Sequence, residues 1–170
     1  MAATRALVLT LVITLAVTLQ VVLFPYVSYA GVVPNLALLV VVAAALVRGP
    51  EFAAVIGFLS GLAIDLAPPA DHVAGRWALA LVVVGYLAGR VRHDARTSAI
   101  AAVVTVAASS FIGTSVFALS GMVLSDPALP ATEALAVIPT AVLYDVLLTP
   151  FVLPLTMRLF RRLEPHQVAY

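Results

Sequence analysis

The feature that most constrains this chain is a succession of long apolar runs with very little polar sequence between them. Six runs rich in Ala, Val and Leu account for most of the 170 residues. Only 10% of the residues are charged, and the mean hydropathy is +1.16. A soluble globule of this size needs a larger polar surface than such a composition provides. The sequence therefore predicts an integral membrane protein.

The predicted fold is all-α, a six-helix transmembrane bundle that forms one domain over residues 1–170. Helices are expected because each one satisfies its own backbone N–H and C=O groups inside a bilayer. Proline and glycine separate the runs. The second, third and fourth runs are shorter than the roughly 20 residues that cross a hydrocarbon core. The expected helices lie approximately at 6–24, 33–47, 52–67, 77–89, 98–124 and 133–157.

The arginines predict the orientation. Positive residues near helix ends stay on the cytoplasmic side, and with a cytoplasmic N-terminus only Arg76 lies outside. Both termini are then cytoplasmic in a multi-pass protein. The small residues Ser28 and Ala30 would also suit a signal-peptide cleavage site, although the preceding run of about 19 residues exceeds the usual apolar region of 7 to 15. The arginines on the cytoplasmic side are Arg5, Arg48, Arg90, Arg92, Arg96, Arg158, Arg161 and Arg162.

Several classes of activity lack the residues they need. The chain has no cysteine. The three histidines, His72, His93 and His166, fall in loops or the tail on different sides of the membrane. We therefore expect each to be a solvated surface residue, with no metal site and no Ser/His/Asp site. No glycine-rich phosphate loop is present, and topology explains the arginines, so nucleic-acid binding is not expected. The sequence predicts no enzyme and no cofactor.

Two pairs of glycines predict close packing of the third and fourth helices. Gly57 and Gly61 form a GxxxG pair, and Gly85 and Gly89 form a matching pair in the next helix. Small residues at this spacing let two backbones approach closely. The short intervening loop makes the helices antiparallel neighbours. A homodimer seam is the alternative use of the same glycines.

Two acidic residues lie within apolar runs. Asp65 ends the third helix near interfacial water, and we expect Arg76 to pair with it and clamp the hairpin; a proton or substrate site is the alternative. Asp145 lies near the middle of the last helix, where a charge costs roughly 2.5 to 3.5 kcal/mol, so it needs a partner, protonation or a wet cavity. The fifth helix has a small, weakly polar face that we expect to pack inward near Asp145. That face consists of Thr105, Ser109, Gly113, Phe117 and Gly121.

Three stretches together resemble a known family. They are "VPNLALLVVVAAALVRGPEFAAVIGFLSGLAIDL", "AGRWALALVVVGYLAGRVR" and "IPTAVLYDVLLTPFVLPL". In their order and spacing they are similar to the family of rod shape-determining MreD proteins, over about residues 33–157. Positions matching its motifs are Gly57, Phe58, Gly61, Leu62 and Asp65 in the third helix and Pro139, Tyr144 and Asp145 in the last.

The resemblance implies a non-enzymatic scaffold of the bacterial cytoplasmic membrane within the elongasome, the complex that extends the lateral cell wall. Members of this family associate with MreC and, through it, with MreB, RodA and a class B penicillin-binding transpeptidase. The family also looks distantly like the S components of energy-coupling-factor transporters. A vitamin-binding subunit is therefore one alternative, and a proton-coupled carrier that uses Asp65 and Asp145 is another. The segment "RVRHDAR", residues 90–96, would suit contact with anionic lipid or a cytoplasmic partner.

Overall fold

The computed structural model describes residues 2–29, 31–68, 72–95, 98–124 and 131–163, and this part of the chain is helical apart from its connections. The first helix, α1, continues into a π-helical turn, Leu19–Leu23, and a 3-10 turn, Phe24–Val27. A single turn, α5, separates the fourth and fifth of the predicted helices. The helices are α1 Ala2–Thr18, α2 Leu36–Arg48, α3 Pro50–Asp65, α4 Arg76–Arg90, α5 Arg92–Ala95, α6 Ala99–Val123 and α7 Ala131–Arg162.

All six predicted helices are present, with differences at their ends. The second helix begins at Leu36 rather than 33, because Asn35 caps it by accepting a hydrogen bond from the N–H of Leu38 at 2.9 Å. The last helix continues to Arg162, five residues beyond the predicted end, with Pro150 and Pro154 inside it. The predicted boundary was the end of the apolar run before Arg158, and the helix continues through the arginine-containing segment that follows.

Three helices have the length and composition to cross a membrane. They comprise Ala3–Val27, Ala99–Val123 and Ala136–Arg162. The other three, α2, α3 and α4, have 13, 16 and 15 residues. At 1.5 Å per residue these are about 20 to 24 Å long, less than the roughly 30 Å of a hydrocarbon core. The six-helix bundle thus combines three helices of spanning length with three shorter ones.

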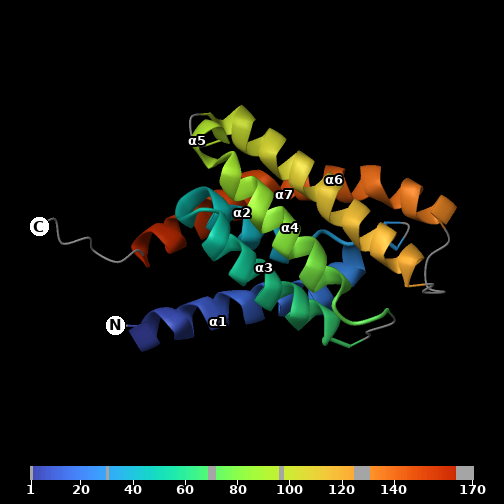
Figure 1. Ribbon diagram of the computed structural model, residues 1–170, viewed down its shortest axis with the longest axis horizontal. Coiled ribbons are helices and arrows are strands. Elements are labelled where there is room, and N and C mark those ends of the chain that lie inside the picture. The colour runs from blue at the N-terminus through green and yellow to red at the C-terminus, as the bar shows by residue number, and fades with distance from the viewer. Residues whose placement is uncertain (1, 30, 69–71, 96–97, 125–130, 164–170) are drawn as a thin grey trace, which may run out of the picture.

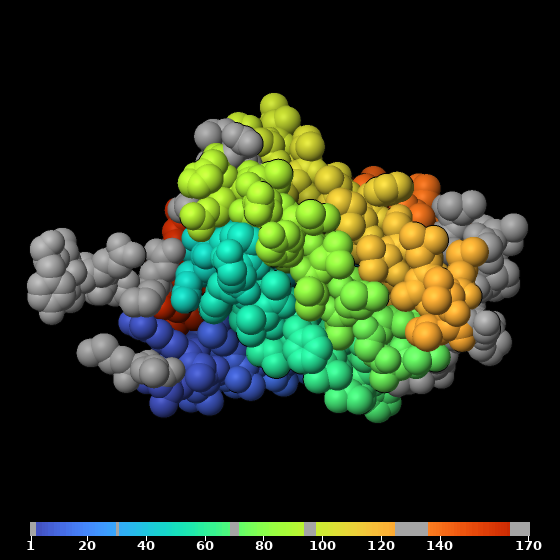
Figure 2. Space-filling view, viewed as in Figure 1, coloured from blue at the N-terminus to red at the C-terminus, as the bar shows by residue number. Residues whose placement is uncertain are grey.

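The short helix α2 forms the centre of the bundle. Every residue from Leu36 to Val47 is buried, and the helix packs against α1, α3, α4, α6 and α7 (Figure 1). In the space-filling view, α1, α3, α4 and α6 form most of the visible face and cover α2 (Figure 2). A helix that is apolar on all sides is stable only when surrounded in this way.

The α3–α4 hairpin packs through its glycines, as the sequence predicted. A Cβ atom at Gly57 would overlap the carbonyl group of Leu81, and one at Gly61 would overlap the main chain of Trp77 and Ala78. Gly85 and Gly89 face α3 in the same way. These glycines are therefore used within the chain, where they let the two backbones approach each other.

The helix ends separate the arginines in space. The start of α1 and the ends of α2, α4 and α7 lie at one end of the bundle (Figure 1). We call it the arginine-rich end, because it carries Arg48, Arg90 and Arg162. The opposite end is formed by the end of α3, the start of α4, the end of α6 and the start of α7 (Figure 1). Arg76 lies there, as the first residue of α4.

Glycine packing in the hairpin predicts that Gly57→Ala and Gly61→Ala each destabilise the protein. The added methyl group meets main-chain atoms of α4 that cannot rotate away, and overpacking costs about 1–3 kcal/mol. Thermal unfolding of the purified protein in detergent would measure the loss. Val55→Leu, at an exposed position of the same helix, is the control. Unchanged unfolding of both alanine variants would contradict the proposed close contact.

Candidate functional site

Two buried carboxyl groups dominate the polar interior, and each one binds the start of a neighbouring helix. The first turn of any helix leaves N–H groups without helical partners. In a lipid environment each unsatisfied group costs several kcal/mol. Asp65 and Asp145 provide acceptors for these groups at α4 and α2, and both side chains are 1% exposed.

Asp65, the last residue of α3, caps α4. One carboxyl oxygen accepts hydrogen bonds from the N–H groups of Gly75 at 2.9 Å and Ala78 at 3.0 Å. The other accepts from the N–H of Trp77 at 3.1 Å and lies 2.9 Å from the ring nitrogen of His72. A carboxylate is also favoured at this position because a helix start carries partial positive charge.

The prediction that Asp65 pairs with Arg76 was wrong. Asp65 is buried inside the protein rather than accessible to water, and its hydrogen bonds come from main-chain amides and His72, not from Arg76. Arg76, 2% exposed, donates to the carbonyl oxygen of Phe117 at 2.8 Å and lies 3.9 Å from the centre of the Phe117 ring. The N–H groups of a helix start point along its axis toward Asp65, whereas the Arg76 side chain extends sideways to α6.

His72 was expected to be a solvated surface residue, and this was also wrong. Its ring lies against Asp65 and makes an edge contact with Phe117, with ring centres 5.3 Å apart. His93 lies in α5 at the arginine-rich end, while His166 lies outside the described residues. The sequence carries no signal for the contacts of His72, because they depend on how this residue packs against Asp65 and Phe117 and not on a local pattern.

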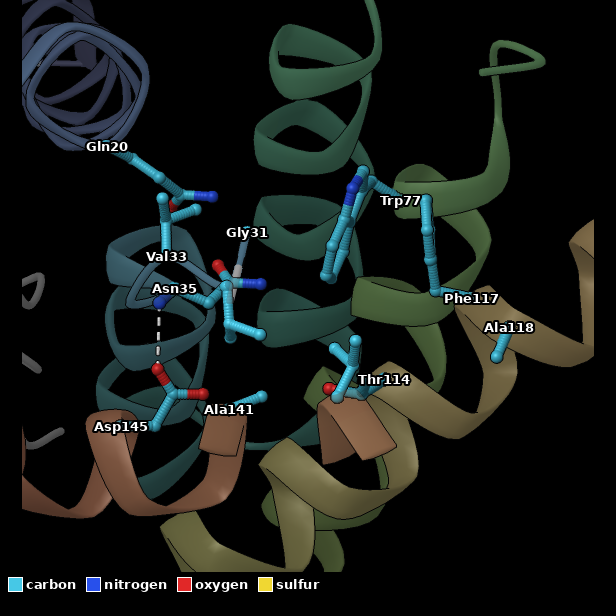
Figure 3. Close-up of a pocket in the computed structure, with 12 residues that line it drawn as sticks. Gln20, Gly31, Val33, Asn35, Trp77, Thr114, Phe117, Ala118, Ala141 and Asp145 are labelled. Atoms are coloured by element: carbon cyan, nitrogen blue, oxygen red, sulfur yellow. Dashed lines mark hydrogen bonds between the residues drawn. The ribbon is translucent and has the colours of Figure 1, made fainter. Parts of the chain in front are cut away.

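Asp145 of α7 binds the start of α2 and also α6. One oxygen accepts from the N–H of Asn35 at 2.8 Å (Figure 3). The other accepts from the hydroxyl of Ser110 at 2.7 Å. The expected small face of α6 does pack inward, since Thr105, Ser109, Gly113 and Gly121 are buried. The residue that binds Asp145 is Ser110, next to that face.

The start of α2 receives one further acceptor, from α1. The N–H of Ala37 donates to the side-chain oxygen of Gln20 at 3.1 Å. Gln20 lies in the π-helical turn and is 5% exposed. Sequence reasoning missed both Gln20 and Asn35. Asn35 could have been found, since an asparagine directly before an apolar run is a common helix start.

A cavity of about 200 Å³ adjoins this group (Figure 3). Gln20, Asn35 and Asp145 lie on one side of it, and the rings of Trp77 and Phe117 stack on the other with centres 4.4 Å apart. Small-molecule sites usually have volumes of roughly 300–1,000 Å³. Among the described residues, no group of three or more His, Asp or Glu side chains could hold a metal ion.

Three other residues that match the family motifs do not contact either carboxyl group. The hydroxyl of Tyr144 donates to the carbonyl oxygen of Val27 at 3.0 Å and ties α7 to the turn after α1. Phe58 of α3 is half exposed and Pro139 of α7 is exposed. Neither side chain reaches Asp65 or Asp145, so the structure gives these two positions no part in the polar interior.

Three helices of spanning length around a buried apolar helix define an integral membrane protein of the all-helical class. The model of one family, rod shape-determining protein MreD, matches residues 2–163, and the chain therefore belongs to the MreD family. That family has a role in determining rod cell shape. No curated protein and no solved structure matches the chain. The predicted likeness to the S-component fold stays a prediction.

The contacts of Asp65 predict a specific pattern of coupling. In double-mutant cycles, Asp65→Asn with His72→Gln should show an interaction energy of about 0.5 kcal/mol or more, because the two side chains are in contact. Asp65→Asn with Arg76→Gln should be closer to additive, because each residue binds a different partner. Thermal or denaturant unfolding in detergent gives the energies. Stronger coupling with Arg76 would restore the salt-bridge interpretation.

The stability of variants at Asp145 should depend on how many hydrogen-bond acceptors the new side chain keeps. Asp145→Leu leaves the N–H of Asn35 and the hydroxyl of Ser110 unpaired, and each such group costs about 1–3 kcal/mol. Asp145→Asn keeps one acceptor oxygen and should have an intermediate effect. The control Thr10→Val removes an exposed hydroxyl bonded to its own helix and should change little. Unfolding midpoints in detergent test this order, and equal midpoints for Asp145→Leu and Thr10→Val would contradict it.

Proposed function

We propose that this protein is a non-enzymatic scaffold of the cell-wall elongation complex in the bacterial cytoplasmic membrane. It supports rod shape and lateral peptidoglycan synthesis by associating with MreC, and through MreC with MreB, RodA and a class B penicillin-binding transpeptidase. The observation that carries this proposal is the match of the MreD family over residues 2–163.

The contacts of the buried polar residues support a role as a scaffold. The two carboxyl groups inside the bundle are both engaged with helix starts, and the guanidinium of Arg76 is engaged with α6. These groups connect α2 to α7, α3 to α4, and α4 to α6. Connections of this kind favour a bundle that keeps one shape while other proteins bind to its outside.

The outer surface supports binding within the membrane. Large apolar side chains are exposed along α6 and α7, among them Ile100, Phe111, Leu143 and Phe151. Such side chains suit lipid and the membrane helices of partners. A homodimer would use the same kind of surface, since the hairpin glycines are already covered within the chain.

The orientation follows from the arginine-rich end, which we assign to the cytoplasm by the rule that positive residues stay inside. The start of α1 and the end of α7 lie at this end (Figure 1). Both termini are then cytoplasmic. Asp65, Asp145 and the cavity belong to the outer half or the middle of the membrane.

The cavity is the feature that a solute-binding or proton-coupled function would use. Its volume of about 200 Å³ is below the usual range for small-molecule sites. The acceptors on its wall are already bound to main-chain N–H groups and Ser110. We therefore prefer the scaffold to a vitamin-binding subunit or a proton-coupled carrier.

Purification of the tagged protein from its native membrane in mild detergent, with quantitative mass spectrometry of what accompanies it, tests the proposal. We expect MreC and the wall-elongation synthases to be enriched over a tagged, unrelated multi-pass protein that serves as the control. Depletion of the protein should convert rods to rounded cells. Recovery of an energy-coupling membrane subunit with its ATPases, or of a bound vitamin, would contradict the scaffold.

A further inference from the structure

A groove of about 630 Å³ lies between α1 and α7, and α2 forms its floor. Its walls are apolar, with Leu15 and Leu19 from α1 and Phe151 and Leu155 from α7. The helix α1 packs on α2 and α3, whereas α7 packs on α2 and α6. The two walls are therefore separated across α2, and the groove between them opens to the side of the bundle.

The length of the groove matches one leaflet of a bilayer. Along α7 it extends from Phe151 to Arg162, which is about 16 Å at 1.5 Å per residue. Half of a hydrocarbon core of about 30 Å is about 15 Å. The groove therefore has the depth of a single acyl chain and reaches the membrane surface at the arginine-rich end.

Positive charge is concentrated where the groove reaches that surface. Arg158 and Arg162 line the groove, are both exposed, and lie four residues apart on one face of α7. Among the residues that the structure describes, none of those lining the groove has a carboxyl side chain. Guanidinium groups bind phosphate oxygens in pairs, and basic sites between membrane helices bind the headgroups of anionic lipids.

We propose that the groove between α1 and α7 binds an anionic phospholipid, with an acyl chain over α2 and the phosphate at Arg158 and Arg162. A partner helix fits less well. Helix contacts in membranes favour small residues that let backbones approach. Among the described lining residues only Ala16 and Thr156 are of this kind, and the others are Leu, Val, Phe and Arg. The proposal depends on the membrane class of the protein and not on its association with MreC.

Native mass spectrometry of the purified protein, titrated with phosphatidylglycerol or phosphatidylcholine, is the first test. We expect phosphatidylglycerol to be retained preferentially. Arg158→Gln and Arg162→Gln should each weaken its binding about fivefold, and both together more than tenfold. Arg161→Gln, on the same turn but outside the groove lining, is the matched control and should change nothing.

A second variant tests the acyl chain separately from the charge. Leu15→Trp enlarges an exposed side chain of the groove lining and should lower phosphatidylglycerol binding, whereas Leu11→Trp, at an exposed position outside the lining, should not. Equal binding of both lipids, or no effect of the double arginine variant, would mean annular lipid contact only and would overturn the proposal.

Photo-crosslinking from Leu155 in native membranes separates lipid from protein. Leu155 lines the groove and is exposed, so a crosslinker there should label phospholipid. A dominant crosslink to a second copy of the chain or to another membrane protein would instead assign the groove to a helix. Unchanged unfolding of each variant in detergent confirms that a loss of lipid binding is not a loss of fold.

Discussion

The N–H groups at the start of a helix inside a membrane are the constraint on which the rest of this structure depends. Helices α2 and α4 are too short to begin and end outside the hydrocarbon core, so their first turns need acceptors from elsewhere in the chain. Asp145 and Asp65 provide them from α7 and α3. Each carboxyl group thereby satisfies main-chain donors and joins two helices at the same point.

Other helices also pack around the carboxyl groups of Asp145 and Asp65. Ser110 of α6 binds Asp145 of α7, and Gln20 of the π-helical turn after α1 binds the start of α2. Segments from four parts of the chain therefore meet at one end of the central helix. Near Asp65, His72 and Trp77 contact Phe117 of α6. Because these polar residues are bound to one another and to main-chain groups inside the bundle, the surfaces left for contact with other molecules are the apolar outer surface and the charged helix ends.

Local patterns were sufficient to predict the helices, the glycine contacts and the inward face of α6. Apolar runs, proline positions and GxxxG spacing are properties of neighbouring residues, so sequence carries them directly. The partners of Asp65 could not be predicted, because three of its four donors are main-chain N–H groups, which every residue but proline has. Gln20 was missed because its burial depends on the π-helical turn that contains it.

The hydrogen bond between Asn35 and Asp145 joins residues that are 110 positions apart. A chain made at roughly 5–20 residues per second therefore synthesises the start of its central helix about 6 to 22 s before the acceptor for that helix exists. During that interval the N–H of Asn35 depends on water, lipid headgroups or the insertion machinery. The centre of the bundle is thus completed last, when α7 enters the membrane, and assembly of the protein is timed by its C-terminal helix.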